Sequence, residues 1–197
     1  RLLADRESPD SGSVIFRNGL RVGFLDQNPE FDPSLSLMDN LLPVIPKEHH
    51  DEWSHEDRVR QMLSQLGIDD LSLRVDRLSG GQVKRVAIAR LLLGEPDLVI
   101  LDEPTNHLDI STIEWLEGYL TRSRVTLLMV THDRYFLDRV CNKIIEIDMQ
   151  TTFTYEGNFD TYLRRRAERI EAMTAEQAKL RNTLRREQEW MRRQPQA

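Results

Sequence analysis

The sequence predicts an α/β fold with a mainly parallel sheet, a small helical subdomain and a long C-terminal helix. Two short apolar runs, 98–101 and 125–130, each end in polar residues, as strands buried in a parallel sheet do. Segments with helical periodicity precede and separate these runs. From Asp160 to Pro195 the chain is dominated by Arg, Glu, Gln, Ala and Leu and has no glycine, which predicts one long helix.

The composition indicates a folded globular protein, because 39% of its 197 residues are hydrophobic and 30% are charged. This length suits one domain with an appendage. No apolar run approaches the roughly 18 residues that span a bilayer, so we expect no direct membrane insertion. The single cysteine, Cys141, cannot form an internal disulfide, which fits a reducing, cytoplasmic location.

The first part of the chain contains short elements. Residues 1–4 favour helix but have no cap, so we expect them to end a helix that begins earlier. Two β-type runs, 13–16 and 20–25, are separated by Asn18-Gly19, a strong hairpin signal. The proline-rich region that follows predicts a loop with a helical turn at 37–42. Ser54 then caps a helix that ends at Gly67.

The next helix begins with Leu78-Ser79-Gly80-Gly81-Gln82. Ser79 and Gln82 have the spacing of a capping box, and Gly94 with Pro96 ends the helix near Leu93. Two glycines in a first turn cost roughly 1 kcal/mol each relative to alanine, unless something must approach the backbone closely. The turn is therefore either a flexible helix start or a site for an anion, which free N–H groups and the helix dipole attract.

Polar residues follow both predicted strands of the parallel sheet. Asp102 and Glu103 come after the first strand, and Thr131 and His132 come after the second, where ligands bind in open α/β sheets. Between them Asp109 can cap a helix. The acids fit a Mg²⁺–nucleotide site, although a solvated loop and a structural histidine also explain these residues. Runs 143–148 and 151–155 predict two late strands.

The long helix is basic on an otherwise acidic chain. Residues 162–197 contain ten Arg or Lys against five Asp or Glu, a net charge of +5, whereas the remainder carries −11. A polyanion contact at this end and a solvated linker helix explain the excess equally well. Three groups of arginines are the candidates for phosphate contacts, with Trp190 available for stacking: Arg164-Arg165-Arg166, Arg185-Arg186 and Arg192-Arg193.

Together and in this order, four signals resemble the ATP-binding-cassette (ABC) ATPases, which are P-loop NTPases: 78–82, Asp102-Glu103-Pro104-Thr105, Asn106-His107-Leu108-Asp109 and His132. The resemblance covers about residues 1–160 and implies ATP and Mg²⁺ as ligands. It implies that Asp102 holds Mg²⁺ through water, that Glu103 is the general base, and that Gln27 senses Mg²⁺ and the γ-phosphate. His132 would contact the γ-phosphate, and Asp109 would lie at the interface with a second cassette. The signature residues would bind the γ-phosphate of ATP held by that cassette: Ser79, Gly80, Gly81 and Gln82.

One departure from the family is large. The chain has no Gly-x-x-x-x-Gly-Lys-Ser/Thr loop, which cradles the phosphates of the cassette's own nucleotide. The family's order places that Walker A loop just before Arg1, so residues 1–160 are interpreted as a partial ATP-binding domain with a helical subdomain at about 37–95. Alone, this fragment should bind ATP poorly and be inactive.

Two features resemble the ABC-F group, soluble ATPases with two fused cassettes that act on ribosomes. Asn106-His107-Leu108-Asp109 differs from the Ser-Ala-Leu-Asp type of transporter cassettes, and residues 161–197 resemble the start of the linker between cassettes, which lies against ribosomal RNA and tRNA. We therefore expect the first cassette of a Uup-like member. The alternatives are the ATP-binding subunit of an ABC transporter and a DNA-associated structural ATPase.

Overall fold

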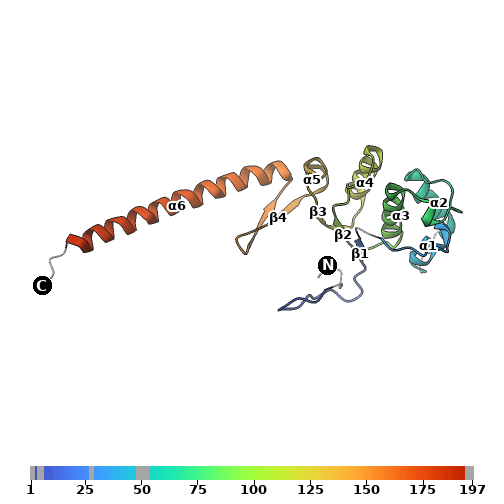
Figure 1. Ribbon diagram of the computed structural model, residues 1–197, viewed down its shortest axis with the longest axis horizontal. Helices are drawn as coiled ribbons and strands as arrows, with labels where there is room; N and C mark the ends of the chain where they lie inside the picture. The colour runs from blue at the N-terminus through green and yellow to red at the C-terminus, as the bar shows by residue number, and fades with distance from the viewer. Residues whose placement is uncertain (1–2, 4–6, 27–28, 48–53, 194–197) are drawn as a thin grey trace. The chain divides into compact units, whose positions relative to one another are not determined.

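The computed structural model describes residue 3 and residues 7–26, 29–47 and 54–193 (Figure 1). The chain divides into two compact units, residues 1–133 and residues 134–197. The α/β class, the parallel sheet and the long C-terminal helix are all present, as predicted. Among the described residues, no helix is both long and apolar enough to cross a membrane.

The parallel sheet belongs to the first unit. It consists, in the described part of the chain, of β1 (Val22–Leu25), β2 (Leu98–Asp102) and β3 (Thr126–Val130) in that order. Pairing aligns Leu25 with Leu101 and Asp102 with Val130, so the carboxyl ends of the strands meet at one edge. β2 is buried as predicted. β3 is only half-buried, because it lies at the border of this sheet, and the expectation of burial on both faces was wrong for it.

The predicted hairpin before β1 was also wrong. Asn18-Gly19 does form a turn, in which the Leu20 N–H donates to the Arg17 carbonyl at 3.1 Å and Gly19 has φ 77°. Residues 13–16, however, are not a strand. Ile15 is 87% exposed, so this run buries too little apolar surface to hold a pairing. β1 pairs with β2 instead.

Three helices of the first unit share a hydrophobic core. These are α1 (Leu37–Leu41), α2 (His55–Gln65) and α3 (Gly80–Leu93), with short 3₁₀ segments at Leu42–Val44 and Val75–Arg77. Ser36 and Ser54 cap α1 and α2, as their hydroxyls accept from backbone N–H groups three residues on. The centre of this core is fully buried and consists of Leu37, Leu41, Val59, Leu63, Val86 and Ala89.

α3 connects this helical core to the sheet. Its other side packs on β1 so closely that a Cβ at Gly23 would lie 2.4 Å from Leu91 Cδ1. A larger residue in the middle of β1 would have to displace the Leu91 side chain and would also lie 3.1 Å from Pro96. α4 (Ile110–Arg122) follows β2, and its Trp115 packs against the helical core.

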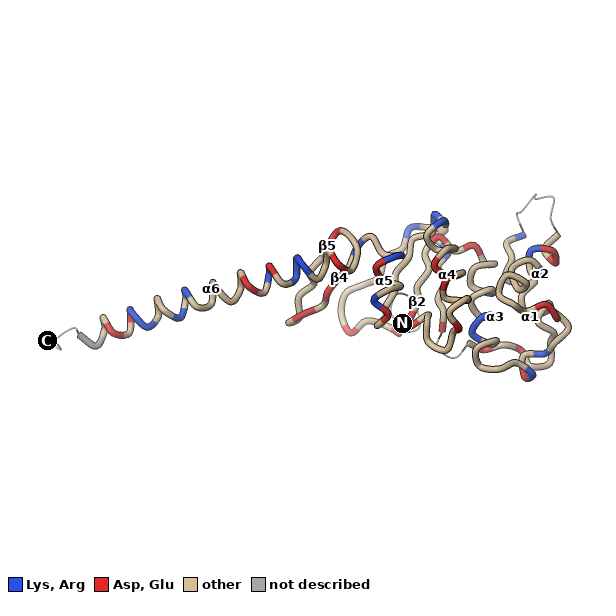
Figure 2. Tube along the Cα trace, turned by 90° about the horizontal axis from the view of Figure 1, so that it is seen from above, with Lys and Arg blue, Asp and Glu red and all other residues tan. Residues whose placement is uncertain are grey.

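The second unit contains α5 (Arg134–Val140), the antiparallel pair β4 (Lys143–Asp148) and β5 (Thr151–Glu156), and α6 (Phe159–Arg193). The two strands and the long helix were predicted. Figure 2 shows basic and acidic residues interspersed along α6. Not all of its arginines are free for phosphate, because Arg166 Nε donates to Glu146 at 2.6 Å. Arg166 therefore differs from Arg164 and Arg165, which are more exposed.

Candidate functional site

The site is built around Glu103, the residue after β2. Its backbone is in the left-handed region with φ 47°, which a non-glycine residue rarely adopts. The Glu103 N–H donates to the Val130 carbonyl at 2.8 Å, which continues the β2–β3 ladder past the end of β2 and holds this conformation. Such strain is kept where the surrounding structure fixes it, and it is frequent at functional sites.

The carboxylate of Glu103 contacts the end of β3. Its Oε2 accepts from the Thr131 hydroxyl at 3.3 Å and from the His132 N–H at 3.4 Å, and its Oε1 lies 3.6 Å from His132 Nε2. The side chain of Glu103 is 17% exposed, whereas that of His132 is 99% exposed. The structure thus brings together the two strand-end residues that the sequence singled out. Glu103 is held, and the imidazole remains open to a ligand.

The signature turn at the start of α3 has the predicted capping box. Gln82 Oε1 accepts from the Ser79 N–H at 2.9 Å, and the Ser79 hydroxyl accepts from the Gln82 N–H at 3.3 Å. The two glycines between them differ. A Cβ at Gly81 would lie 3.2 Å from the His107 carbonyl oxygen, whereas nothing lies within 4 Å of one at Gly80. The close approach that two glycines suggested is therefore made at Gly81, by backbone of the same chain.

A cavity of about 690 Å³ joins this turn to Glu103. His107, with φ 65°, brings its carbonyl to the turn. The polar and glycine positions that line the cavity are Gly80, Gly81, Lys84, Glu103, Asn106 and His107. The signature turn and the acid at the end of β2, which are distant in the sequence, therefore face one space.

Lys84 and Asp26 are two charged residues of this region that the sequence analysis missed. Lys84 is only 8% exposed, and burial lowers the pKa of its ammonium group, while the charges of Asp102 and Asp26 act in the opposite direction. Asp26 follows β1 as Asp102 ends β2. Two signals in the sequence could have pointed to them. Lys84 is a lysine on the apolar side of α3, and Asp26 is a second acid directly after a strand.

Asp109 lies at the N-cap of α4, as predicted, but binds differently from an ordinary cap. Its carboxylate accepts from the hydroxyls of Ser111 and Thr112, the latter at 2.7 Å. These hydroxyl donors, Ser111 first, lower the pKa of Asp109 to about 2. Asp109 is therefore a fixed negative charge at the start of α4.

Of the two residues predicted to bind Mg²⁺, the structure describes one. Gln27 lies outside the described residues. Asp102 ends β2 beside Glu103, and carboxylate oxygens are ligands that Mg²⁺ prefers. In nucleotide sites Mg²⁺ takes one or two carboxylates together with phosphate oxygens and water. The residues at the end of β2 therefore fit such an ion.

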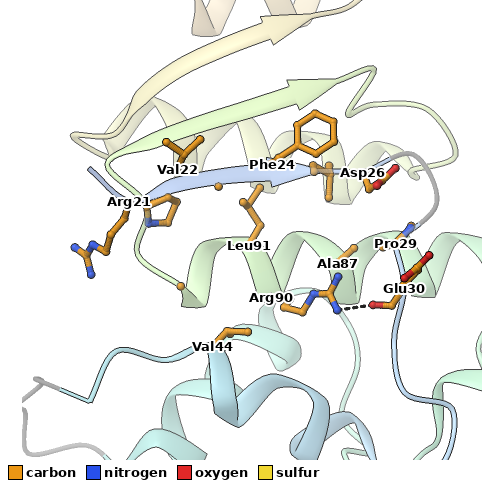
Figure 3. A pocket seen from close by; sticks show the side chains of 14 residues that line it. Arg21, Val22, Phe24, Asp26, Pro29, Glu30, Val44, Ala87, Arg90 and Leu91 are labelled. Atoms are coloured by element: carbon orange, nitrogen blue, oxygen red, sulfur yellow. Dashed lines mark hydrogen bonds between the residues drawn. The ribbon is translucent and has the colours of Figure 1, made fainter. Parts of the chain in front are cut away.

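A second cavity, of about 700 Å³, is lined by residues of β1, of α3 and of the segment after residue 28 (Figure 3). Figure 3 shows Arg90 of α3 beside Glu30, whose carbonyl accepts from Arg90 Nη1 at 2.6 Å. The Arg90 guanidinium also lies over the ring of Phe31, with its carbon 4.2 Å from the ring centre. These contacts attach the segment after residue 28 to α3.

Comparison with known proteins gives the family. Two ABC transporter models match the chain, one over residues 1–106 and one over residues 145–197. The chain is 37% identical to the uncharacterized ABC transporter ATP-binding protein YfmR of Bacillus subtilis, and 34% identical to the energy-dependent translational throttle protein EttA of Mycobacterium tuberculosis; both alignments cover 98% of the chain. It is 33% identical, over 89% of its length, to ABC transporter F family member 5 of Arabidopsis thaliana. The chain spans 36%, 40% and 31% of these three relatives.

Two solved structures support the fold. One is a dimeric ATP-binding cassette in a post-hydrolysis state with ADP and Pi, at 25% identity and a TM-score of 0.56, covering 70% of this chain and 63% of that one. The other is archaeal ribosome recycling factor aABCE1 in complex with ribosomal stalk protein aP1, at 26% identity and a TM-score of 0.62, covering 82% of this chain and 32% of that one. The predicted P-loop NTPase fold is thereby confirmed. The chain belongs to the ABC transporter ATPase family, and the relatives that it resembles include ABC-F proteins.

Proposed function

We propose that the chain is a cassette of an ABC-F factor that couples ATP binding and hydrolysis to closure against a second cassette. In this proposal Asp102 holds Mg²⁺ through water, and Gln27 senses Mg²⁺ and the γ-phosphate. Glu103 polarises the attacking water, and His132 contacts the γ-phosphate. The helical subdomain at about 37–95 presents the signature turn to the nucleotide of the other cassette.

The observation that carries this proposal is the setting of Glu103. Its carboxylate is largely buried, is held by Thr131 and the His132 backbone, and lies 3.6 Å from an exposed imidazole. A general base must be fixed within hydrogen-bond reach of the water that it activates. The Glu103 carboxylate is such a fixed group. The exposed imidazole of His132 lies beside it, at the end of the adjacent strand.

The proposed interface with a second cassette is supported by the two outward features of the site. Ser79 and Gln82 order the first turn of α3, which leaves Gly80 open. Asp109 adds a negative charge at the start of α4. One of the similar structures is a dimeric cassette, which indicates the kind of partner that these two features would meet.

The test of hydrolysis uses the full-length protein with its second cassette inactivated. Glu103→Gln removes the base but keeps the size and the hydrogen-bond acceptor of the side chain, so we expect nucleotide binding to persist and turnover to fall by about 10²–10⁴-fold. Glu114→Gln, an exposed position on α4, is the matched control and should leave turnover unchanged. Undiminished turnover in the Glu103→Gln protein would contradict the assignment.

We propose further that the protein acts in the cytoplasm on the ribosome, and that residues 161–197 begin a linker that contacts ribosomal RNA or tRNA. The names of its relatives support this: one is a translational throttle protein, and a structural relative is a ribosome recycling factor. The basic excess of residues 162–197 supports an RNA contact as well. Tighter binding to duplex DNA than to ribosomes at equal salt would favour the DNA-associated function instead, and copurification with an integral membrane protein would favour a transporter subunit.

A further inference from the structure

Arg90, near the end of α3, binds a segment of backbone that lies against the helix. Its Nη1 donates to the Glu30 carbonyl at 2.6 Å, as Figure 3 shows. Its guanidinium carbon also lies 4.2 Å from the centre of the Phe31 ring, where the aromatic face attracts the cation. A hydrogen bond from a charged donor is stronger than one between neutral groups. A single side chain therefore fixes two consecutive residues to α3.

The segment that Arg90 fixes also forms part of the proposed site. Pro29, the residue before Glu30, lines the cavity that joins the signature turn to Glu103. Pro29 and Glu30 also line the cavity of Figure 3, together with Arg90. Arg90 lies ten residues after Gly80, which corresponds to about 15 Å along the helix. The backbone at Pro29 therefore connects the end of α3 with the cavity at its start.

The same segment continues into the core that α1, α2 and α3 share. Phe31 packs against that core, and Arg74 Nε donates to the Pro33 carbonyl at 2.9 Å. The strand that precedes the segment, β1, belongs to the parallel sheet. The chain thus passes from the sheet to the helices within a few residues, and Arg90 holds it in between.

We propose that Arg90 is a positioning residue that couples the cassette's own nucleotide to the signature turn. The inference rests on the proposed function, in which Gln27, two residues before Pro29, senses Mg²⁺ and the γ-phosphate. A nucleotide that contacts this part of the chain also acts on α3, because Arg90 fixes Glu30 and Phe31 to the helix. The signature turn then takes its place opposite the second cassette when the cassette's own site is filled. The coupling therefore favours closure on ATP.

Arg90→Met removes the charge and the hydrogen-bond donor but keeps an unbranched apolar stem beside Phe31. In the full-length protein we expect it to lower ATP turnover about tenfold, within the range of about 5–150-fold that coupling between sites usually spans. Binding of a fluorescent ADP analogue should stay within about twofold of the wild type, because ADP lacks the γ-phosphate through which the coupling acts. Arg90→Lys keeps a cation over Phe31 and should retain most of the turnover.

Hydrogen exchange separates coupling from stabilisation of the fold. The protein is full-length, and its second cassette is altered so that it binds no nucleotide. A non-hydrolysable ATP analogue should slow exchange in the peptides 29–36 and 79–86 of the wild type. In Arg90→Met the analogue should still slow exchange in 29–36 but no longer in 79–86. An arginine that only stabilises the helices predicts faster exchange in both peptides, with the response to nucleotide retained.

Arg85→Gln is the matched control on the same helix. Arg85 Nη1 donates to the Leu66 carbonyl at 2.8 Å, a contact of the same kind that is made away from the segment at Pro29. This change should lower the melting temperature and keep the nucleotide response of 79–86. Phe31→Leu takes the place of Arg90→Met if that variant folds poorly. It removes the ring under the guanidinium, keeps an apolar side chain in the core, and should weaken the response in the same direction.

The outcomes separate the two proposals. If the wild type responds to the analogue in both peptides and Arg90→Met does so too, the coupling is wrong while the proposed function stands. A response of 79–86 that is lost equally in Arg85→Gln also overturns the role of Arg90, because the effect then belongs to the stability of α3. If the wild type binds neither nucleotide analogue, the proposed function itself fails.

Discussion

At the residue scale, Gly80 and Gly81 are neighbours with different surroundings. Alanine in place of glycine stabilises a helix by up to about 1 kcal/mol. Gly80→Ala should show this gain, since nothing lies within 4 Å of the added Cβ. Gly81→Ala should lose it or reverse it, because its Cβ would lie 3.2 Å from the His107 carbonyl oxygen. Urea unfolding of the two variants measures the difference. Equal free energies of unfolding would mean that the loop containing His107 shifts without an energetic cost.

Asp109 gives a prediction about pH. Its pKa of about 2 lies below the ordinary value of 3.8, so the ionised side chain contributes stability that is complete above about pH 4 and is lost as the pH falls towards 2. Replacing both donors, by Ser111→Ala with Thr112→Val, should raise the pKa towards 3.8. Carboxyl NMR shifts of Asp109 follow this directly. Ser123→Ala removes a hydroxyl that donates to Leu120 and should leave the Asp109 pKa unchanged.

At the scale of elements, Glu146 attaches α6 to β4. It accepts from Arg166 Nε at 2.6 Å, from Arg169 Nη2 at 2.9 Å and from the Tyr155 hydroxyl at 2.9 Å. Burial alone would raise the pKa of Glu146, but the bonds from Arg166 and Tyr155 and the charge of Arg169 lower it on balance.

Glu146→Gln should therefore destabilise the second unit by about 2–3 kcal/mol, because it leaves the largely buried Arg169 with only the more distant carboxylate of Asp148, 3.5 Å away, as countercharge. Thermal unfolding measures this change in stability. Glu156→Gln breaks the exposed pair with Lys143 and should cost less than about 1 kcal/mol. A similar effect in both variants would show that burial does not matter at Glu146.

Local sequence signals predicted where helices begin, but they did not predict which segments pair or contact one another. Ser54 and the Ser79–Gln82 capping box fixed where α2 and α3 begin, because a cap is satisfied within its own turn. Residues 13–16 failed as a strand since a strand needs a neighbour, and strand propensity does not specify one. Arg166 looked equivalent to Arg165, yet only a fold that places Glu146 beside α6 distinguishes them.

At the scale of the whole molecule, the resemblance of four motifs in order was enough to indicate the family. The strand ends of a parallel sheet meet at one edge. The contact between Glu103 and His132 follows from that rule. The approach of the His107 carbonyl to Gly81 and the burial of Lys84 do not, since both depend on how α3 packs against the sheet. Residues that connect distant segments are recognised only once those segments are in place.

The exposed arginines of α6 test the ribosomal proposal. Neutralising Arg164, Arg165, Arg185 and Arg186 to Gln in the full-length protein should weaken ribosome binding and flatten its dependence on salt. The slope of log K against log salt concentration falls by about 0.7–0.9 for each phosphate that the protein no longer neutralises, so an effect at two or more phosphates is measurable. The control neutralises four exposed arginines of the first unit and should retain the wild-type slope: Arg17, Arg60, Arg77 and Arg122. Both sets remove four positive charges, so a slope that falls alike in both would assign the effect to overall charge rather than to α6.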